Sequence, residues 1–209
     1  VTLDPDYDVF RLLHANERPA SLGRLFGAKK QLLVVPAQAT AEQIKAWQRL
    51  AASWSSLYKN VELIYDNELE KEMNAIADGT AVWLLGWNNE FLKNLQEIFT
   101  SQDLASTSPT FSSALSPTFP LALSAHTVTI DRQQLHANKH AVVLLDADNS
   151  HTPLGFIGAD DAEVIDSLAG KLPHYSSYGV LVFKLPEVNN VIKQHLPVLK
   201  SPMSRTLDQ

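Results

Sequence analysis

Two arrangements of apolar residues alternate along the first half of the chain. Short apolar runs at 31–36, 61–65 and 81–87 have the length and composition of buried strands. After the first and third runs, apolar residues recur at steps of three and four, as on the buried face of an amphipathic helix, and a shorter helix that ends near Gly79 is expected after the second. The clearest helical stripe consists of Ile44, Trp47, Leu50, Trp54 and Leu57. This alternation predicts parallel βαβ units with right-handed crossovers and helices on the faces of a sheet.

Capping residues indicate where the predicted helices begin. Thr40, with Gln43 three residues later, has the spacing of a capping box, in which each side chain bonds the backbone N–H of the other residue. The other expected helix starts are Asp66 or Asn67, Asn88 or Asn89, and Asp160 with Glu163.

The pattern changes after Ser101. Residues 101–120 are rich in Ser, Thr and Pro and have no periodicity, which predicts a long surface loop or hinge. Residues 121–130 alternate only loosely, whereas 141–145 and 178–183 have the apolar character of buried strands. The chain after Pro186 is expected to form a tail with one or two helical turns.

The expected fold is therefore α/β, with a three-layer, mostly parallel sheet of the flavodoxin or Rossmann type and helices on both faces. An antiparallel strand pair fits in the C-terminal half. Residues 1–30 form an irregular segment that packs on the domain, 31–186 form the single α/β domain, and 187–209 form the C-terminal tail.

Composition and missing motifs exclude several function classes. The 209 residues include no cysteine, which rules out disulfides, thiolate zinc sites and cysteine nucleophiles. A formal net charge of -6 argues against nucleic-acid binding, and no apolar stretch approaches the roughly 20 residues that insert in a membrane. His-Glu-x-x-His, Gly-x-Ser-x-Gly and phosphate-binding glycine motifs are missing. The sequence thus assigns no catalytic residue, metal ligand or cofactor to this chain.

A histidine pair is the first group weighed as a site. His136 and His140 would share one face of a helix and could bind a metal there, but their segment leads into a strand, where this spacing does not converge. Asp146, Asp148 and His151 follow and would add ligands only if the chain folds back. The favoured interpretation is a solvated connection between strands.

The second group is the segment 171–178, which is dense in hydrogen-bonding side chains. His174 could act as a base for Ser176 or Ser177, but no glycine elbow or orienting acid accompanies it. The favoured interpretation is a proline-terminated helix whose His and Tyr side chains pin the loop to the core.

A ligand site in an open α/β sheet is expected at the carboxyl ends of the strands. The residues that follow those strands include Pro36, Asp66, Trp87 with Asn88, and Asp146. The ligand-binding candidates of the whole chain are Trp87, Asn88, His174, Tyr175 and Tyr178.

Three blocks carry a resemblance to a known family. They are DPDYDVFRLL at 4–13, KLPHY at 171–175 followed by Tyr178, and NVIK at 190–193 followed by Pro197 and SPM at 201–203. In this order they resemble the C-terminal, non-catalytic α/β region of bacterial gluzincin peptidases, the aminopeptidase N-like zinc enzymes.

The resemblance implies an accessory module that docks on, orients or stabilises the peptidase domain of the same polypeptide. It implies an exported, periplasmic or otherwise extracytoplasmic bacterial protein, with zinc held only in that peptidase domain. Because Val1 is not a start methionine, the chain is expected to be a piece of a longer protein. The alternative function is a small-ligand, peptide or glycan binding module, and a hydrolase that uses His174 ranks last.

Overall fold

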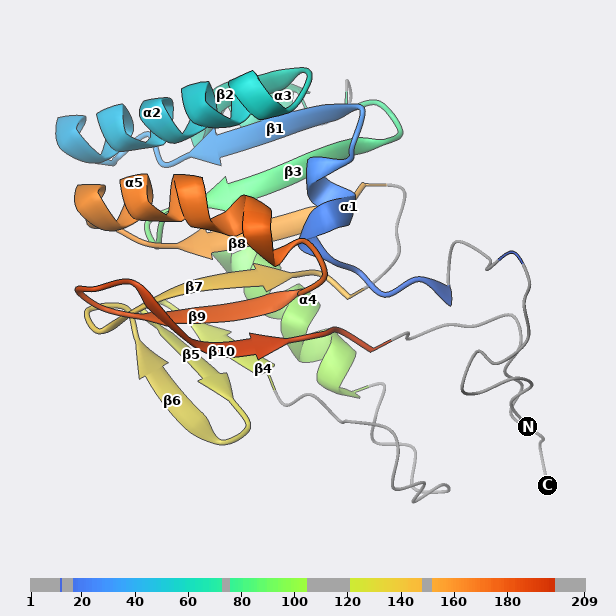
Figure 1. Cartoon of the computed structure of the whole chain (residues 1–209), viewed down its shortest axis with the longest axis vertical. Coiled ribbons are helices and arrows are strands. Elements are labelled where there is room, and N and C mark those ends of the chain that lie inside the picture. Colours follow the sequence, from blue (N-terminus) through green and yellow to red (C-terminus); the bar gives the residue numbers. More distant parts are fainter. Residues whose placement is uncertain (1–11, 13–16, 73–75, 105–120, 148–151, 198–209) are drawn as a thin grey trace.

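A seven-stranded mixed sheet forms the centre of the protein in the computed structural model, which describes residues 12, 17–72, 76–104, 121–147 and 152–197 (Figure 1). In spatial order its strands are β10 (Asn189–Gln194), β9 (Val180–Lys184), β7 (His140–Leu145), β8 (Leu154–Gly158), β3 (Thr80–Leu85), β1 (Lys30–Val35) and β2 (Val61–Tyr65). The strands β2, β1, β3 and β8 are parallel, whereas β7, β9 and β10 each run antiparallel to their neighbours. The predicted α/β class is confirmed.

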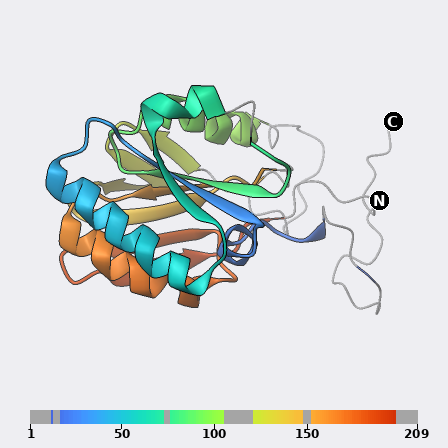
Figure 2. The ribbon, with the colours of Figure 1, turned by 90° about the horizontal axis from the view of Figure 1, so that it is seen from above.

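Helices cover both faces of this sheet, which confirms the three-layer prediction (Figure 2). The helices α2 (Ala41–Leu57) and α5 (Ala162–Lys171) pack against each other on one face. On the other face lie α3 (Asp66–Glu72) and α4 (Leu92–Leu104). The short helix α1 (Leu22–Phe26) contacts the 3-10 helix η3 (Leu172–Tyr175).

The helix α2 forms where the apolar stripe and the capping box predicted it. The Thr40 hydroxyl accepts the Gln43 N–H, and the Gln43 side chain accepts the Thr40 N–H. Trp47, Leu50 and Trp54 of the stripe are buried and Ile44 is half-buried. Leu57, the last residue of the helix, is 61% exposed. The indole N–H of Trp54 donates to the Ala169 carbonyl at 3.0 Å and so ties α2 to α5.

A second sheet was not predicted as such. It has three antiparallel strands, β4 (Leu121–Ser124), β5 (Thr127–Ile130) and β6 (Gln133–His136). Only one side of this small sheet is apolar, and Leu123, Val128 and Leu135 are buried there. Because α4 contacts β4, the small sheet lies beside that helix, and β6 leads directly into β7.

The structure corrects two expectations about the chain ends. The segment after Pro186 forms the edge strand β10 where helical turns were expected, and β9 provides its hydrogen-bonding partner. The segment 1–30 was expected to be irregular, but it contains the helix α1, whose Leu22 and Leu25 are buried. Residues 105–120, most of the predicted loop, and 198–209, most of the predicted tail, lie outside the described residues. No described helix has both the length and the apolar character needed to cross a bilayer.

Candidate functional site

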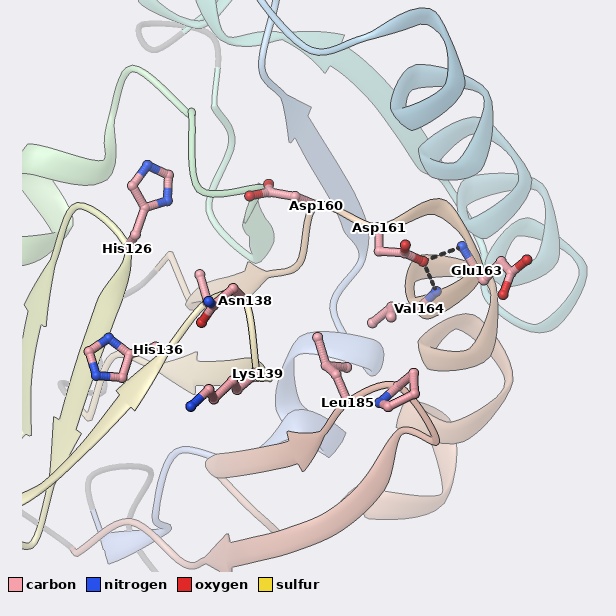
Figure 3. A pocket seen from close by; sticks show the side chains of 11 residues that line it. His126, His136, Asn138, Lys139, Asp160, Asp161, Glu163, Val164 and Leu185 are labelled. Atoms are coloured by element: carbon pink, nitrogen blue, oxygen red, sulfur yellow. Dashed lines mark hydrogen bonds between the residues drawn. The ribbon is translucent and has the colours of Figure 1, made fainter.

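An open recess of about 730 Å³ lies at the carboxyl edge of the parallel strands (Figure 3). One side is built by the loop after β8 and the first turn of α5, and the other side by the small sheet and the turn before β7. The lining residues are Asp160, Asp161, Glu163 and Val164 on the first side, His126, His136, Ala137, Asn138 and Lys139 on the second, and Leu185 with Pro186 after β9. Its volume is in the usual range of small-ligand sites.

Asp160 extends from the end of β8 toward the small sheet (Figure 3). Its carboxylate accepts the backbone N–H of Trp87 at 3.3 Å, and its carbonyl accepts the side-chain N–H of Gln43 at 2.8 Å. Burial raises the pKa of Asp160, while the Trp87 N–H and the charge of His126 oppose that rise. Asp160 is therefore a partly desolvated carboxyl group held on the wall of the recess.

Asp161, the next residue, is the N-cap of α5. Its carboxylate accepts the backbone N–H groups of Glu163 at 2.9 Å and Val164 at 3.0 Å, which caps α5. The predicted helix start is therefore shifted by one residue, from Asp160 to Asp161. This leaves Asp160 as the carboxylate that faces the recess.

The opposite wall is fixed to the main sheet by backbone hydrogen bonds. The Ala137 N–H donates to the His126 carbonyl, and the Lys139 N–H donates to the His136 carbonyl. The Leu185 N–H then donates to the Lys139 carbonyl at 2.9 Å, which joins this wall to the end of β9. The recess is thus built from segments far apart in the sequence.

Trp87 lies next to the recess and is 2% exposed. Its ring packs edge-on against Phe156 at 5.3 Å and lies 6.2 Å from the His126 ring, measured between centroids. Within the described part of the chain, its indole N–H is buried without a hydrogen-bond partner, which is uncommon for such a donor. The predicted site residue Trp87 is therefore near the recess, as part of its support, and its neighbour Asn88 is exposed.

Two polar side chains at the same edge hold the backbone together. The Asp66 carboxylate accepts the N–H groups of Ala37 and Glu90, at 2.8 and 3.0 Å, and thereby joins the ends of β1 and β3. The Asn89 side-chain amide donates to the Val34 carbonyl at 2.9 Å. The buried side chains of Asp66 and Asn89 therefore hold the backbone at the carboxyl edge in place by hydrogen bonds.

The other predicted site residues lie at the opposite, amino edge of the sheet. Tyr175 packs edge-on against Phe183 with centroids 5.7 Å apart, and Tyr178 stacks on His195 at 4.6 Å. His174 is exposed. The structure therefore separates Trp87 and Asn88 from His174, Tyr175 and Tyr178, and the two tyrosines pin this loop to its neighbours.

The histidine pair belongs to the turn between β6 and β7. The Nδ1 atom of His140 lies 3.3 Å from the His136 carbonyl oxygen, a backbone contact. Over the residues that the structure describes, no three acidic or histidine side chains come together to hold a metal ion. Asp148 and His151, which would have added ligands, lie outside the described residues.

No family model, curated protein or solved structure matches this chain significantly. The resemblance to the gluzincin accessory region accordingly stays a prediction. Sequence reasoning missed His126, Lys139 and Leu185 as recess residues, since nothing in their local patterns points to a site. Asp160 had a signal, because it is a polar residue that follows a buried strand.

Proposed function

We propose that this chain is a non-catalytic accessory module of a larger, exported bacterial zinc peptidase, and that it acts by binding a ligand in the recess. The observation that carries the binding role is the recess itself, an open volume of about 730 Å³ at the carboxyl edge of the sheet. Ligands of open α/β sheets bind at this edge.

The chemistry of the lining residues favours binding over bond cleavage. Asp161 caps α5, and Asp160 accepts the Trp87 N–H, so both carboxylates already stabilise the backbone. The lining residues carry no hydroxyl or thiol group that would serve as a nucleophile. What remains is a set of charged and imidazole groups around an apolar base, which suits recognition of a ligand.

The link to a peptidase rests on the three sequence blocks. The first block, apart from Leu12, and residues 201–203 of the third block lie outside the described residues. The second and third blocks are close together, because the Lys171 ammonium donates to the carbonyl of Val188, just before β10. Tyr178 of the second block stacks on His195, which follows the third block. These two contacts join the segment after α5 to β10 and the residues that flank it.

A thermal-shift screen of the purified chain tests the binding role. Peptides, glycans and metabolites are added singly, and hydrolysis of aminoacyl and peptide substrates is measured in parallel. A ligand at 100 times its Kd stabilises the native state by about 2.7 kcal/mol, which raises Tm by about 5–10 °C for a domain of this size. We expect such a shift for at least one class and no hydrolysis.

A matched pair of variants locates the effect. Asp160→Asn should reduce the ligand-induced shift, whereas Asp78→Asn, an exposed carboxylate before β3, should leave it unchanged. Hydrolysis at enzyme-like rates would overturn the non-catalytic proposal. For the peptidase link, the gene upstream of the Val1 codon should encode His-Glu-x-x-His with a later Glu, and a frame without them would overturn that link.

A further inference from the structure

Charged side chains of opposite sign lie on opposite sides of the recess (Figure 3). Asp160 comes from the loop before α5 and its carboxylate points toward the small sheet, whereas the carboxylate of Glu163 points away from the recess (Figure 3). Lys139 comes from the side of the small sheet, together with the imidazoles of His126 and His136. Among the lining residues, the recess therefore has a carboxylate, Asp160, on one side and an ammonium group, Lys139, on the other.

Asp160 is the group best placed to bind a cation. Its carboxylate is held by the Trp87 N–H and points across the recess toward the side of His126. Because a partly desolvated carboxylate has lost some of its hydration, a positively charged ligand group beside it restores favourable interactions. Asp161 is engaged with the α5 backbone, so it does not compete for the same ligand group.

The base between the two walls is apolar. Val164 is 4% exposed, and Leu185 and Pro186 line the recess from the end of β9. A ligand with opposite charges at its ends and a small apolar body between them would match all three surfaces.

We propose that the recess binds a zwitterionic ligand, a short peptide or free amino acid, with its ammonium group beside Asp160 and its carboxylate beside Lys139 and His136. This inference rests on the proposed function, because it takes the recess as the binding site. A ligand with only anionic groups would bring a like charge to the Asp160 carboxylate. A bare metal ion lacks the ligand set among the described residues.

Isothermal titration of the full chain tests the inference with four probes: trialanine, its N-acetylated form, its C-amidated form and the doubly blocked form. Trialanine should bind, and blocking either end should weaken binding about tenfold or more, the loss expected for a hydrogen bond between charged groups. Asp160→Asn should abolish the preference for a free amino end, and Lys139→Met the preference for a free carboxyl end. Asp78→Asn and the exposed Lys59→Met should keep both preferences.

The outcomes separate this inference from the proposed function. If all four peptides bind equally, or the preferences survive in the Asp160→Asn and Lys139→Met variants, the zwitterion assignment is overturned and the binding role stands. If no peptide binds but another compound class raises Tm in an Asp160-dependent manner, the ligand class is wrong and the proposed function holds. If nothing binds in either experiment, both are overturned. Far-UV circular dichroism of each variant confirms that the fold is retained.

Discussion

Replacing Asp66 by alanine should destabilise the protein more than any other single change at the carboxyl edge. Asp66 begins α3 and is 1% exposed. One carboxylate oxygen accepts the N–H groups of Ala37 at 2.8 Å and Asn67 at 2.9 Å, and the other accepts the N–H of Glu90 at 3.0 Å. A single side chain therefore connects the segments that follow β1, β2 and β3.

The size of the effect follows from these three bonds. A hydrogen bond to a charged group contributes about 1.5–3 kcal/mol, and a buried N–H left unpaired costs about 1–3 kcal/mol. Because water can reach part of this edge once the side chain is removed, we take the lower end and expect a loss of about 3–5 kcal/mol. Asp66→Asn keeps one acceptor oxygen but places an amide N–H₂ where the second oxygen was. We expect a loss of about 2 kcal/mol for this variant.

Guanidinium unfolding followed by tryptophan fluorescence measures these differences, since the chain has four tryptophans. The exposed Asp78→Ala variant is the control and should stay within about 0.5 kcal/mol of the wild type. An Asp66→Ala protein whose free energy of unfolding is within about 1 kcal/mol of the wild type, with an unchanged m-value, would show that these three hydrogen bonds contribute little to stability. In that case water replaces the carboxylate without a large cost.

Two further predictions concern the walls of the recess and the fold behind them. At Gly158 an added Cβ would lie 2.6 Å from the Trp87 ring, so Gly158→Ala should destabilise by about 1–3 kcal/mol. At Gly170 in α5 an added Cβ has no neighbour within 4 Å, so Gly170→Ala should stabilise the protein by about 0.5–1 kcal/mol through its higher helix propensity. Chemical denaturation that gives the two glycine variants equal free energies of unfolding would contradict both expectations. Because burial raises the pKa of Asp160 in the folded state, its ionised form is disfavoured there, whereas Asn can still accept the Trp87 N–H. Asp160→Asn should therefore be at least as stable as the wild type at neutral pH. As the pH falls through the folded-state pKa of Asp160 toward the ordinary carboxyl range, the wild type should gain stability relative to the variant. The two Tm values measured across this range should converge or cross, and a constant difference would argue against a desolvated carboxylate.

The parts of the fold that sequence reasoning predicted are those with a strong local signal. The strands β1 and β3 are buried on both faces, so their residues form continuous apolar runs. The helix α2 has both a capping box and an apolar stripe. The edge strand β10 was missed because exposed and half-buried residues alternate along it, and its polar segment pairs only because β9 offers a partner. The small sheet has four-residue strands, too short for a clear period.

The site was harder to predict than the fold. The expectation that a site would lie at the carboxyl ends of the strands matches the recess, but only Trp87 and Asn88 of the predicted site residues lie near that edge. The recess brings together His126, Lys139 and Asp160 through strand order and backbone hydrogen bonds between distant segments. No sequence spacing encodes that assembly. His174 and the two tyrosines drew attention by composition, yet the tyrosines make packing contacts at the other edge.

We propose that this module binds its ligand at the carboxyl edge of its sheet. The most direct test is a chemical-shift map of the isotope-labelled chain titrated with the best ligand from the thermal-shift screen. We expect the perturbed amides to cluster at Asp160, Lys139 and Trp87, and the indole N–H of Trp87 to be among them. Perturbations confined to Tyr175 and Tyr178, at the amino edge, would contradict it.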